Sequence, residues 1–158
     1  TYSGSGATAC TPCAAGSYSA NVDGATTCTT AAAGFFVGAP GASAQTPCPA
    51  GTYSGSAAVA CTPCGVGSYS ANRDGATSCN TATAGSFVGA AGATAETACP
   101  LGRYSGSAAT ECAPCAPGTY AAAEGQTSCT LVSGGGYVDV DGLSEQLPCA
   151  PGRYSGSG

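Results

Sequence analysis

Twelve cysteines recur at a fixed interval along the 158 residues, and their spacing constrains the fold more than any other feature. The shift from one set of four to the next is 51 residues, or 50 for two cysteines of the last set, and other residues repeat with it. A fixed period of this length indicates a tandem-repeat architecture. The expected boundaries are a partial unit (1–9), two periods (10–60 and 61–111), and a third period with the start of the next (112–158).

Each period contains three smaller units marked by a Gly-x-aromatic step. The aromatic residues lie 16 to 18 positions apart. Asp-Gly pairs at Asp23, Asp74 and Asp141 are typical of turns, and Gly and Pro interrupt every stretch long enough for an ordinary helix. We expect a small disulfide-rich repeat protein, an elongated solenoid or rod of short β-hairpin-like rungs, mostly irregular and almost without helix. The aromatic steps are Gly16/Tyr18, Gly34/Phe36, Gly51/Tyr53, Gly67/Tyr69, Gly85/Phe87, Gly102/Tyr104, Gly118/Tyr120, Gly135/Tyr137 and Gly152/Tyr154.

Composition explains why a chain like this needs covalent staples. Ala, Gly, Ser and Thr supply 96 of the 158 residues, whereas Leu, Val and Phe together supply 15 and Ile is absent. So few bulky side chains cannot build one large core. We expect one buried aromatic anchor in each rung, with disulfides supplying most of the stability.

The charged residues exclude several functions. The chain has no His or Lys, three Arg (Arg73, Arg103 and Arg153) and a formal net charge of −5. We therefore expect no nucleic-acid partner, because binding phosphates requires a basic surface. A catalytic base active near neutral pH and a phosphate-binding loop are also missing, so we predict that the protein is not an enzyme and has no cofactor. No apolar stretch is long enough to span a membrane, and no secretion signal opens the sequence.

The positions of the cysteines favour pairing inside each rung. In the first rung Cys13 would open and Cys28 would close the loop. In the second rung the opening and closing positions hold Ala31 and Gln45, so both cysteines of one pair are missing together. The same joint replacement occurs at Ala82 and Glu96 and at Val132 and Gln146. Loss of both partners leaves no orphan thiol, as expected for bonded pairs.

We predict five disulfides and two cysteines with partners elsewhere. Cys10 and Cys149 would bond to neighbouring rungs or to other copies of the chain. The predicted pairs are Cys13–Cys28, Cys48–Cys61, Cys64–Cys79, Cys99–Cys112 and Cys115–Cys129.

Metal and redox sites are the alternatives for these cysteines. A zinc ribbon needs a second Cys-x-x-Cys or a pair of His at suitable spacing, and neither is present. A thioredoxin-like pair needs a βαβ context that the sequence lacks. Calcium at Asp139 and Asp141, or at Asp23 and Asp74, is disfavoured because Asp-Gly turns are commoner and no Asp-x-Asp-x-Asp-Gly loop with a distal Glu follows. We expect no metal.

The segments Cys48-Pro-Ala-Gly-Thr-Tyr-Ser, Cys99-Pro-Leu-Gly-Arg-Tyr-Ser and Cys64-Gly-Val-Gly-Ser-Tyr-Ser resemble the ephrin-receptor-like cysteine-rich repeats. They are more distantly similar to the repeats of tumour-necrosis-factor receptors. The resemblance implies an extracellular, disulfide-stapled rod with little regular secondary structure. Arrays so rich in Ala, Gly and Ser look like those of algal and protist surface proteins, including mastigoneme-type flagellar hairs. The rungs without Cys depart from the family pattern, and we expect Phe36, Phe87 or Tyr137 to hold them by packing.

Exposed-looking hydroxyls suggest covalent glycans. No Asn-x-Ser/Thr sequon is present, so N-glycans are not expected. A surface with so few charges needs another means of staying hydrated, and O-glycans would provide it. The O-glycan candidates are Thr11, Thr46, Thr62, Ser3, Ser5, Ser54, Ser56, Ser105 and Ser107.

Near-identical periods favour a structural protein. We expect a repeat unit of an extracellular, secreted or cell-surface filament that assembles with itself end to end or helically, with attached glycans and no membrane partner. The alternative is a cysteine-rich stalk or binding region of a receptor-like protein. The third period is more apolar than the others, and we expect its Tyr137 and Leu143 to form an assembly contact.

Overall fold

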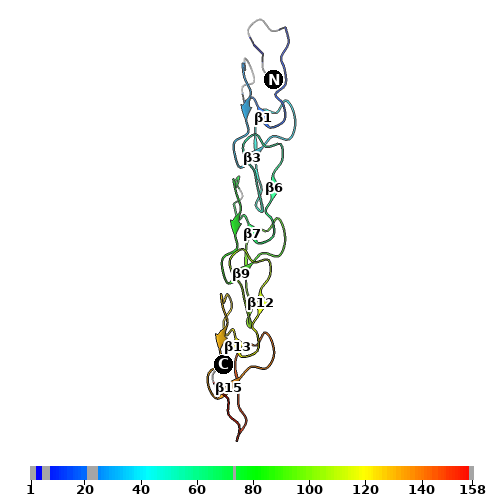
Figure 1. Ribbon diagram of the computed structural model, residues 1–158. Helices are drawn as coiled ribbons and strands as arrows, with labels where there is room; N and C mark the ends of the chain where they lie inside the picture. Colours follow the sequence, from blue (N-terminus) through cyan, green and yellow to red (C-terminus); the bar gives the residue numbers. More distant parts are fainter. Residues whose placement is uncertain (1–2, 5–7, 21–24, 73, 157–158) are drawn as a thin grey trace. The chain divides into compact units, whose positions relative to one another are not determined.

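The computed structural model describes residues 3–4, 8–20, 25–72 and 74–156, and within them it is built from short hairpins (Figure 1). The described residues hold 16 strands of two residues each and no helix, and the strands pair into two-stranded antiparallel sheets. The described residues therefore confirm the predicted fold class as a disulfide-rich repeat protein of short hairpin rungs. The predicted turn at Asp23-Gly24 lies outside the described residues.

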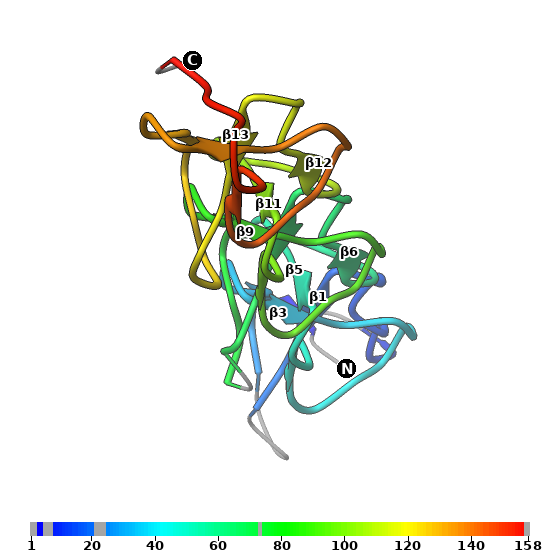
Figure 2. The same cartoon turned by 90° about the horizontal axis from the view of Figure 1, so that it is seen from below.

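In every hairpin the outgoing strand contains the aromatic residue. A loop of 8 to 10 residues joins it to the return strand. Loops therefore make up most of the chain (Figure 2). The outgoing strands are β1 (Ser17–Tyr18), β3 (Phe35–Phe36), β5 (Thr52–Tyr53), β7 (Ser68–Tyr69), β9 (Ser86–Phe87), β11 (Arg103–Tyr104), β13 (Thr119–Tyr120) and β15 (Gly136–Tyr137). The return strands are β2 (Thr29–Thr30), β4 (Thr46–Pro47), β6 (Thr62–Pro63), β8 (Asn80–Thr81), β10 (Thr97–Ala98), β12 (Ala113–Pro114), β14 (Thr130–Leu131) and β16 (Leu147–Pro148).

We number the rungs by these hairpins, so that rung 1 contains β1 and β2 and rung 8 contains β15 and β16. The chain forms two compact units, one of Thr1–Gly65, Tyr69–Asn80 and Ala91–Thr94, the other of Val66–Ser68, Thr81–Ala90 and Ala95–Gly158. Each backbone hydrogen bond between rungs described below lies within one of these units.

A turn with glycine at its third position starts every outgoing strand. In rung 3 the Thr52 amide donates to the Pro49 carbonyl at 3.1 Å, and Gly51 between them has φ of +81°. A positive φ at this position is what a type II turn requires, and glycine adopts it without steric cost. The Gly-x-aromatic step is therefore the sequence signature of this turn.

The same glycine binds the next rung through both of its backbone polar groups. The Gly51 amide donates to the Ser70 carbonyl at 2.8 Å, and the Gly51 carbonyl accepts from the Cys64 amide at 2.8 Å. Gly16, Gly34, Gly67, Gly85, Gly102, Gly118 and Gly135 make equivalent pairs of bonds, with donor–acceptor distances of 2.8 to 3.3 Å. Glycine thus sets the register between successive rungs.

Close packing forbids a side chain at these glycines. A Cβ atom built on Gly51 would lie 2.1 Å from the carbonyl oxygen of Gly92, and one on Gly102 would lie 1.9 Å from that of Gly142. These carbonyls belong to the turn two rungs further along the chain. Six of the glycines, in rungs 1 to 6, approach a backbone carbonyl in this way, at 1.9 to 2.5 Å from the built Cβ.

The core consists of small side chains, and this corrects the prediction of one buried aromatic per rung. Tyr53 is half-buried, and Tyr137 is 40% exposed. The residue that follows the aromatic is the buried one, for example Ser54 at 3% and Val88 at 2% exposure. The aromatic residue itself lies in the outgoing strand and stays partly exposed. A small residue at the buried position allows rungs to approach closely enough for backbone hydrogen bonds.

Replacing Gly51 by Ala tests the glycine interaction. The new Cβ would collide with the Gly92 carbonyl and the residue would be held at an unfavourable φ, so we expect a loss of about 2 to 4 kcal/mol in the free energy of unfolding. Gly55→Ala is the matched control, since nothing lies within 4 Å of its Cβ position. Denaturant unfolding of the oxidised protein, followed by circular dichroism, measures both. Equal stability of the two variants would contradict the account.

Candidate functional site

Five disulfides are the strongest chemical feature of the described residues. Their Cα atoms lie 5.7 to 5.8 Å apart, within the usual range for a disulfide. They join Cys13–Cys28, Cys48–Cys61, Cys64–Cys79, Cys99–Cys112 and Cys115–Cys129, the pairs expected from the sequence. Each closes a loop inside one rung, with a sequence separation of 13 to 15 residues. Closing a loop of this length stabilises the fold by about 3 kcal/mol in the loop-entropy model.

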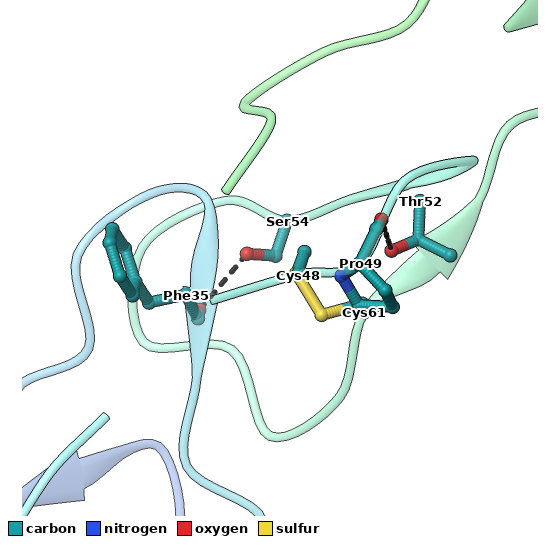
Figure 3. The surroundings of a disulfide bond; sticks show 6 residues. All are labelled: Phe35, Cys48, Pro49, Thr52, Ser54 and Cys61. Carbon is teal, nitrogen blue, oxygen red and sulfur yellow. Dashed lines mark hydrogen bonds between the residues drawn. A yellow bond between two sulfur atoms is a disulfide. The ribbon is translucent and has the colours of Figure 1, made fainter. Parts of the chain in front are cut away.

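The opening cysteine of each pair is buried, and in four of the five pairs the closing cysteine is only half-buried, the exception being Cys112 at 5% exposure. Cys48 is completely buried and Cys61 is half-buried at the surface of rung 3. Figure 3 shows this bond beside two side-chain hydrogen bonds, from Ser54 Oγ to the Phe35 carbonyl at 2.9 Å and from Thr52 Oγ1 to the Pro49 carbonyl at 2.7 Å. The disulfide therefore fastens the surface end of the loop to the buried turn. Cys61 and Cys64 of one Cys-x-x-Cys segment belong to different disulfides.

Cys10 and Cys149 form no disulfide in the structure. The Cys149 amide donates to the Gly135 carbonyl at 3.0 Å, as the Cys48 amide does to that of Gly34 at 2.8 Å. Cys149 therefore occupies an opening position. Cys10 precedes a return segment like that after Cys61, which gives it a closing position. A bond to a neighbouring rung or copy stays a prediction.

The rungs without cysteine carry a polar link in place of the disulfide. In rung 2 the Gln45 side chain accepts a hydrogen bond through Oε1 from the Ala32 amide at 2.8 Å. In rung 5 Glu96 accepts from the Thr83 amide at 2.6 Å and from Thr83 Oγ1 at 2.9 Å. In rung 8 Gln146 bonds to the amide and hydroxyl of Ser133. We call these three links the side-chain clamps.

The sequence contained a signal for the clamps, namely a Gln or Glu at each closing position that lacks cysteine. The prediction that aromatic packing holds these rungs missed the acceptor oxygen, present in the Gln or Glu at each empty closing position. The oxygen bonds one residue beyond the empty opening position, so it spans the gap that a disulfide closes elsewhere. Ala31, Ala82 and Val132 fill the opening position with exposures of 0, 0 and 6%.

The predicted O-glycan sites divide into exposed and buried hydroxyls. Thr11, Thr46, Thr62, Ser56 and Ser107 are exposed. Ser3 is half-buried, and Ser5 lies outside the described residues.

Ser54 and Ser105 are the wrong candidates. They are 3 and 4% exposed, and each hydroxyl donates to a backbone carbonyl of the preceding rung at 2.9 Å. Because they are buried, a glycosyltransferase cannot reach these two hydroxyls. The sequence did not predict this burial, since both Ser residues of a Ser-Gly-Ser step look like exposed turn residues.

The residues predicted for assembly lie in rung 8. Tyr137 pairs with Leu147 across β15 and β16, and both are exposed, at 40 and 36%. Val140 in the same rung is 52% exposed, whereas Leu143 is half-buried and its carbonyl accepts from the Ala121 amide at 3.2 Å. We call Tyr137, Val140 and Leu147 the rung-8 apolar patch.

The described residues enclose no cavity, and within the same residues no three His, Cys, Asp or Glu side chains lie close enough to share a metal ion. No helix in the described part of the chain could cross a membrane.

Removing a clamp tests its contribution. In Gln45→Ala the Ala32 amide loses its acceptor, and we expect a loss of about 1 kcal/mol in the free energy of unfolding. Gln45→Glu is the control, because the chain itself uses Glu at this position in rung 5, and it should retain most of the stability. Denaturant titrations of the two oxidised variants measure the difference. If the clamp contributes nothing, Gln45→Ala and Gln45→Glu will have the same free energy of unfolding.

Comparison with known proteins agrees with this geometry. The family described as "Tyrosine-protein kinase ephrin type A/B receptor-like" matches residues 51–99 and 102–149. Each match starts at the turn glycine of a rung with cysteines and ends at the opening cysteine three rungs later. No curated protein sequence matches the chain. Since the two matches together cover more than half of the residues, the chain belongs to the ephrin-receptor-like family of cysteine-rich repeats.

Proposed function

We propose that this chain is a structural repeat region of an extracellular filament and that it assembles with copies of itself. The observation that carries the proposal is the recurrence of one glycine interaction in all eight rungs, with partners at equivalent positions of each rung. A chain in which the same backbone contact joins each rung to the next is suited to an extended repeat structure.

The disulfides support the extracellular location. Disulfides form and persist in oxidising compartments, and five of them close loops in the described residues. Reduction would break all five of these covalent links. Family membership supports the same location, because cysteine-rich repeats of this kind depend on disulfides that form in oxidising compartments. Neither a nucleic acid nor a membrane is a partner in this proposal.

A cysteine-rich stalk or binding region of a receptor-like protein is the second candidate. The family name favours it, because the name comes from cell-surface receptors. In that role the rungs would space other domains from the cell surface, and copies of the chain would not associate. The two candidates differ in whether the purified chain polymerises.

The lateral contact between copies is proposed at the rung-8 apolar patch. The corresponding positions of rung 2 hold Ala39 and Thr46 where rung 8 holds Val140 and Leu147. Rung 8 thus exposes bulky side chains where its counterpart exposes small or polar ones. Leu143, predicted from the sequence to take part, would lie at the half-buried margin of the contact.

Substituting Tyr137 of the rung-8 apolar patch together with Leu143 at its margin tests assembly. We expect Tyr137→Ser combined with Leu143→Ser to weaken association by at least tenfold in the concentration required, with the five disulfides intact. The milder variant Leu147→Thr copies rung 2 and controls for damage to the hairpin, and it should weaken assembly without loss of stability. Sedimentation velocity and negative-stain electron microscopy provide the readout. Unchanged filaments in both variants would contradict a contact at this patch, and discrete monomers of the unmodified chain at all concentrations would favour the stalk.

Glycans are proposed at the exposed hydroxyls. Thr46 and Thr62 begin the return strands β4 and β6 and are exposed, and Pro follows each of them. For residues 1–158 produced in a glycosylating host, we expect an intact mass that exceeds 14.7 kDa by whole hexose or pentose units. After reduction and proteolysis, fragment spectra should place the sugars on exposed positions such as Thr46, Thr62, Ser56 and Ser107, and leave Ser54 and Ser105 unmodified. A native mass equal to that of the bare oxidised chain would exclude glycosylation.

A further inference from the structure

The order of disulfides and side-chain clamps along the chain has a mechanical consequence. A disulfide carries tension directly from its opening to its closing cysteine, so the loop between them cannot lengthen while the bond is intact. Cys13–Cys28 and Cys48–Cys61 close loops with separations of 15 and 13 residues. Under tension, only the segments between disulfides can extend.

These segments differ greatly in length. Cys61 and Cys64 are three residues apart, and so are Cys112 and Cys115. By contrast, Cys28 and Cys48 are 20 residues apart, as are Cys79 and Cys99, and each of these long segments contains one whole rung without a disulfide. Nearly all the extensible length of the oxidised chain between Cys13 and Cys129 therefore lies in rungs 2 and 5.

Non-covalent contacts alone keep rung 2 folded. The Gln45 clamp joins its two loop ends at 2.8 Å. The Gly34 amide donates to the Ser54 carbonyl of the next rung at 2.9 Å, and the Gly41 amide donates to the Cys13 carbonyl of the previous rung at 2.8 Å. In rung 5 the Glu96 clamp and the Gly85 and Gly92 amides make the corresponding bonds. All of these bonds can break and form again without any chemical step.

We propose that the rungs without disulfides are the sites at which this chain lengthens reversibly under tension. Each would open as one event and release the segment between two disulfides, after which the covalent bonds limit further extension. A segment of 20 residues extends to about 70 Å at most. The inference concerns a single chain, so its failure would leave the proposed filament function standing, and failure of assembly would leave this inference standing.

Single-molecule force spectroscopy of the oxidised chain tests the proposal. Pulling residues 1–158 from both ends, with the thiols of Cys10 and Cys149 alkylated, should give two equal contour-length increments from rungs 2 and 5. Each increment should equal the extended length of 20 residues less the folded separation of the bounding cysteines. Rung 8 carries the same clamp but is not followed by a disulfide in these residues, so its event has a different length and serves as an internal reference.

A designed disulfide provides the decisive variant. Ala31→Cys with Gln45→Cys places cysteines at the opening and closing positions of rung 2, and peptide mapping without reduction verifies their bond. We expect this variant to lose one of the two equal increments, and adding Ala82→Cys with Glu96→Cys should remove both. Reductant is the matched control, because it should restore them together with the loops of the native disulfides.

Gln45→Ala separates the clamp from the rest of the rung. It should lower the opening force of one increment and keep its length, whereas Gln45→Glu should change neither. The proposal is overturned if the oxidised chain shows no equal increments, or if both survive in the variant with a verified disulfide in rung 2.

Discussion

The structure depends on a glycine that donates one backbone hydrogen bond to the next rung and accepts another from it. The positive φ of this residue directs both polar groups along the repeat, and the absence of a side chain lets a carbonyl two rungs away approach its Cα. At Gly51 both bonds measure 2.8 Å. The two-residue strands, the small buried side chains and the spacing of the cysteines all follow from this close approach.

Because the rungs approach one another closely, little apolar surface is buried between them. Covalent or polar links within each rung supply the stability that burial does not. The buried side chains are Cys, Ala, Ser and Val, each too small to stabilise a rung by burial alone. A disulfide from the buried turn to the surface end of the loop closes five rungs. In the remaining described rungs a Gln or Glu oxygen reaches the neighbouring backbone amide from the same closing position.

The sequence predicted the parts of the fold that depend on spacing. The cysteine positions indicated which residues open and close each loop, and the Gly-x-aromatic step located every outgoing strand. Burial was harder to predict, because Ser54 and Ser56 belong to the same Ser-Gly-Ser step and yet only Ser54 points into the rung contact. Tyr53 is the largest side chain in its rung but lies outside the core, since the core is too narrow for a ring. The clamps were not predicted because Gln45, Glu96 and Gln146 recur at the closing positions as replacements for cysteine, and the sequence alone does not show which amide their side-chain oxygen accepts from.

Membership of the ephrin-receptor-like repeats is consistent with a framework of turn glycines and disulfides. Such a framework explains how a chain made mostly of Ala, Gly, Ser and Thr can fold. The turn glycines recur in every rung, whereas the residues at the exposed loop positions differ between rungs. In this chain most of those positions hold Ala, Ser or Thr. Single exposed bulky residues occur at Val59, Val66 and Leu101, and several occur in rungs 7 and 8, where Leu131 is 62% exposed. The framework and the surface can therefore vary independently.

Amide hydrogen exchange of the oxidised protein, measured by nuclear magnetic resonance, tests the glycine interaction most directly. The account predicts slow exchange at the turn glycines, such as Gly34, Gly51 and Gly85, whose amides donate to the next rung. Gly55 and Gly106 are exposed within the described residues and should exchange near the rate of an unfolded chain. Equal exchange rates at the two groups of glycines would contradict the account.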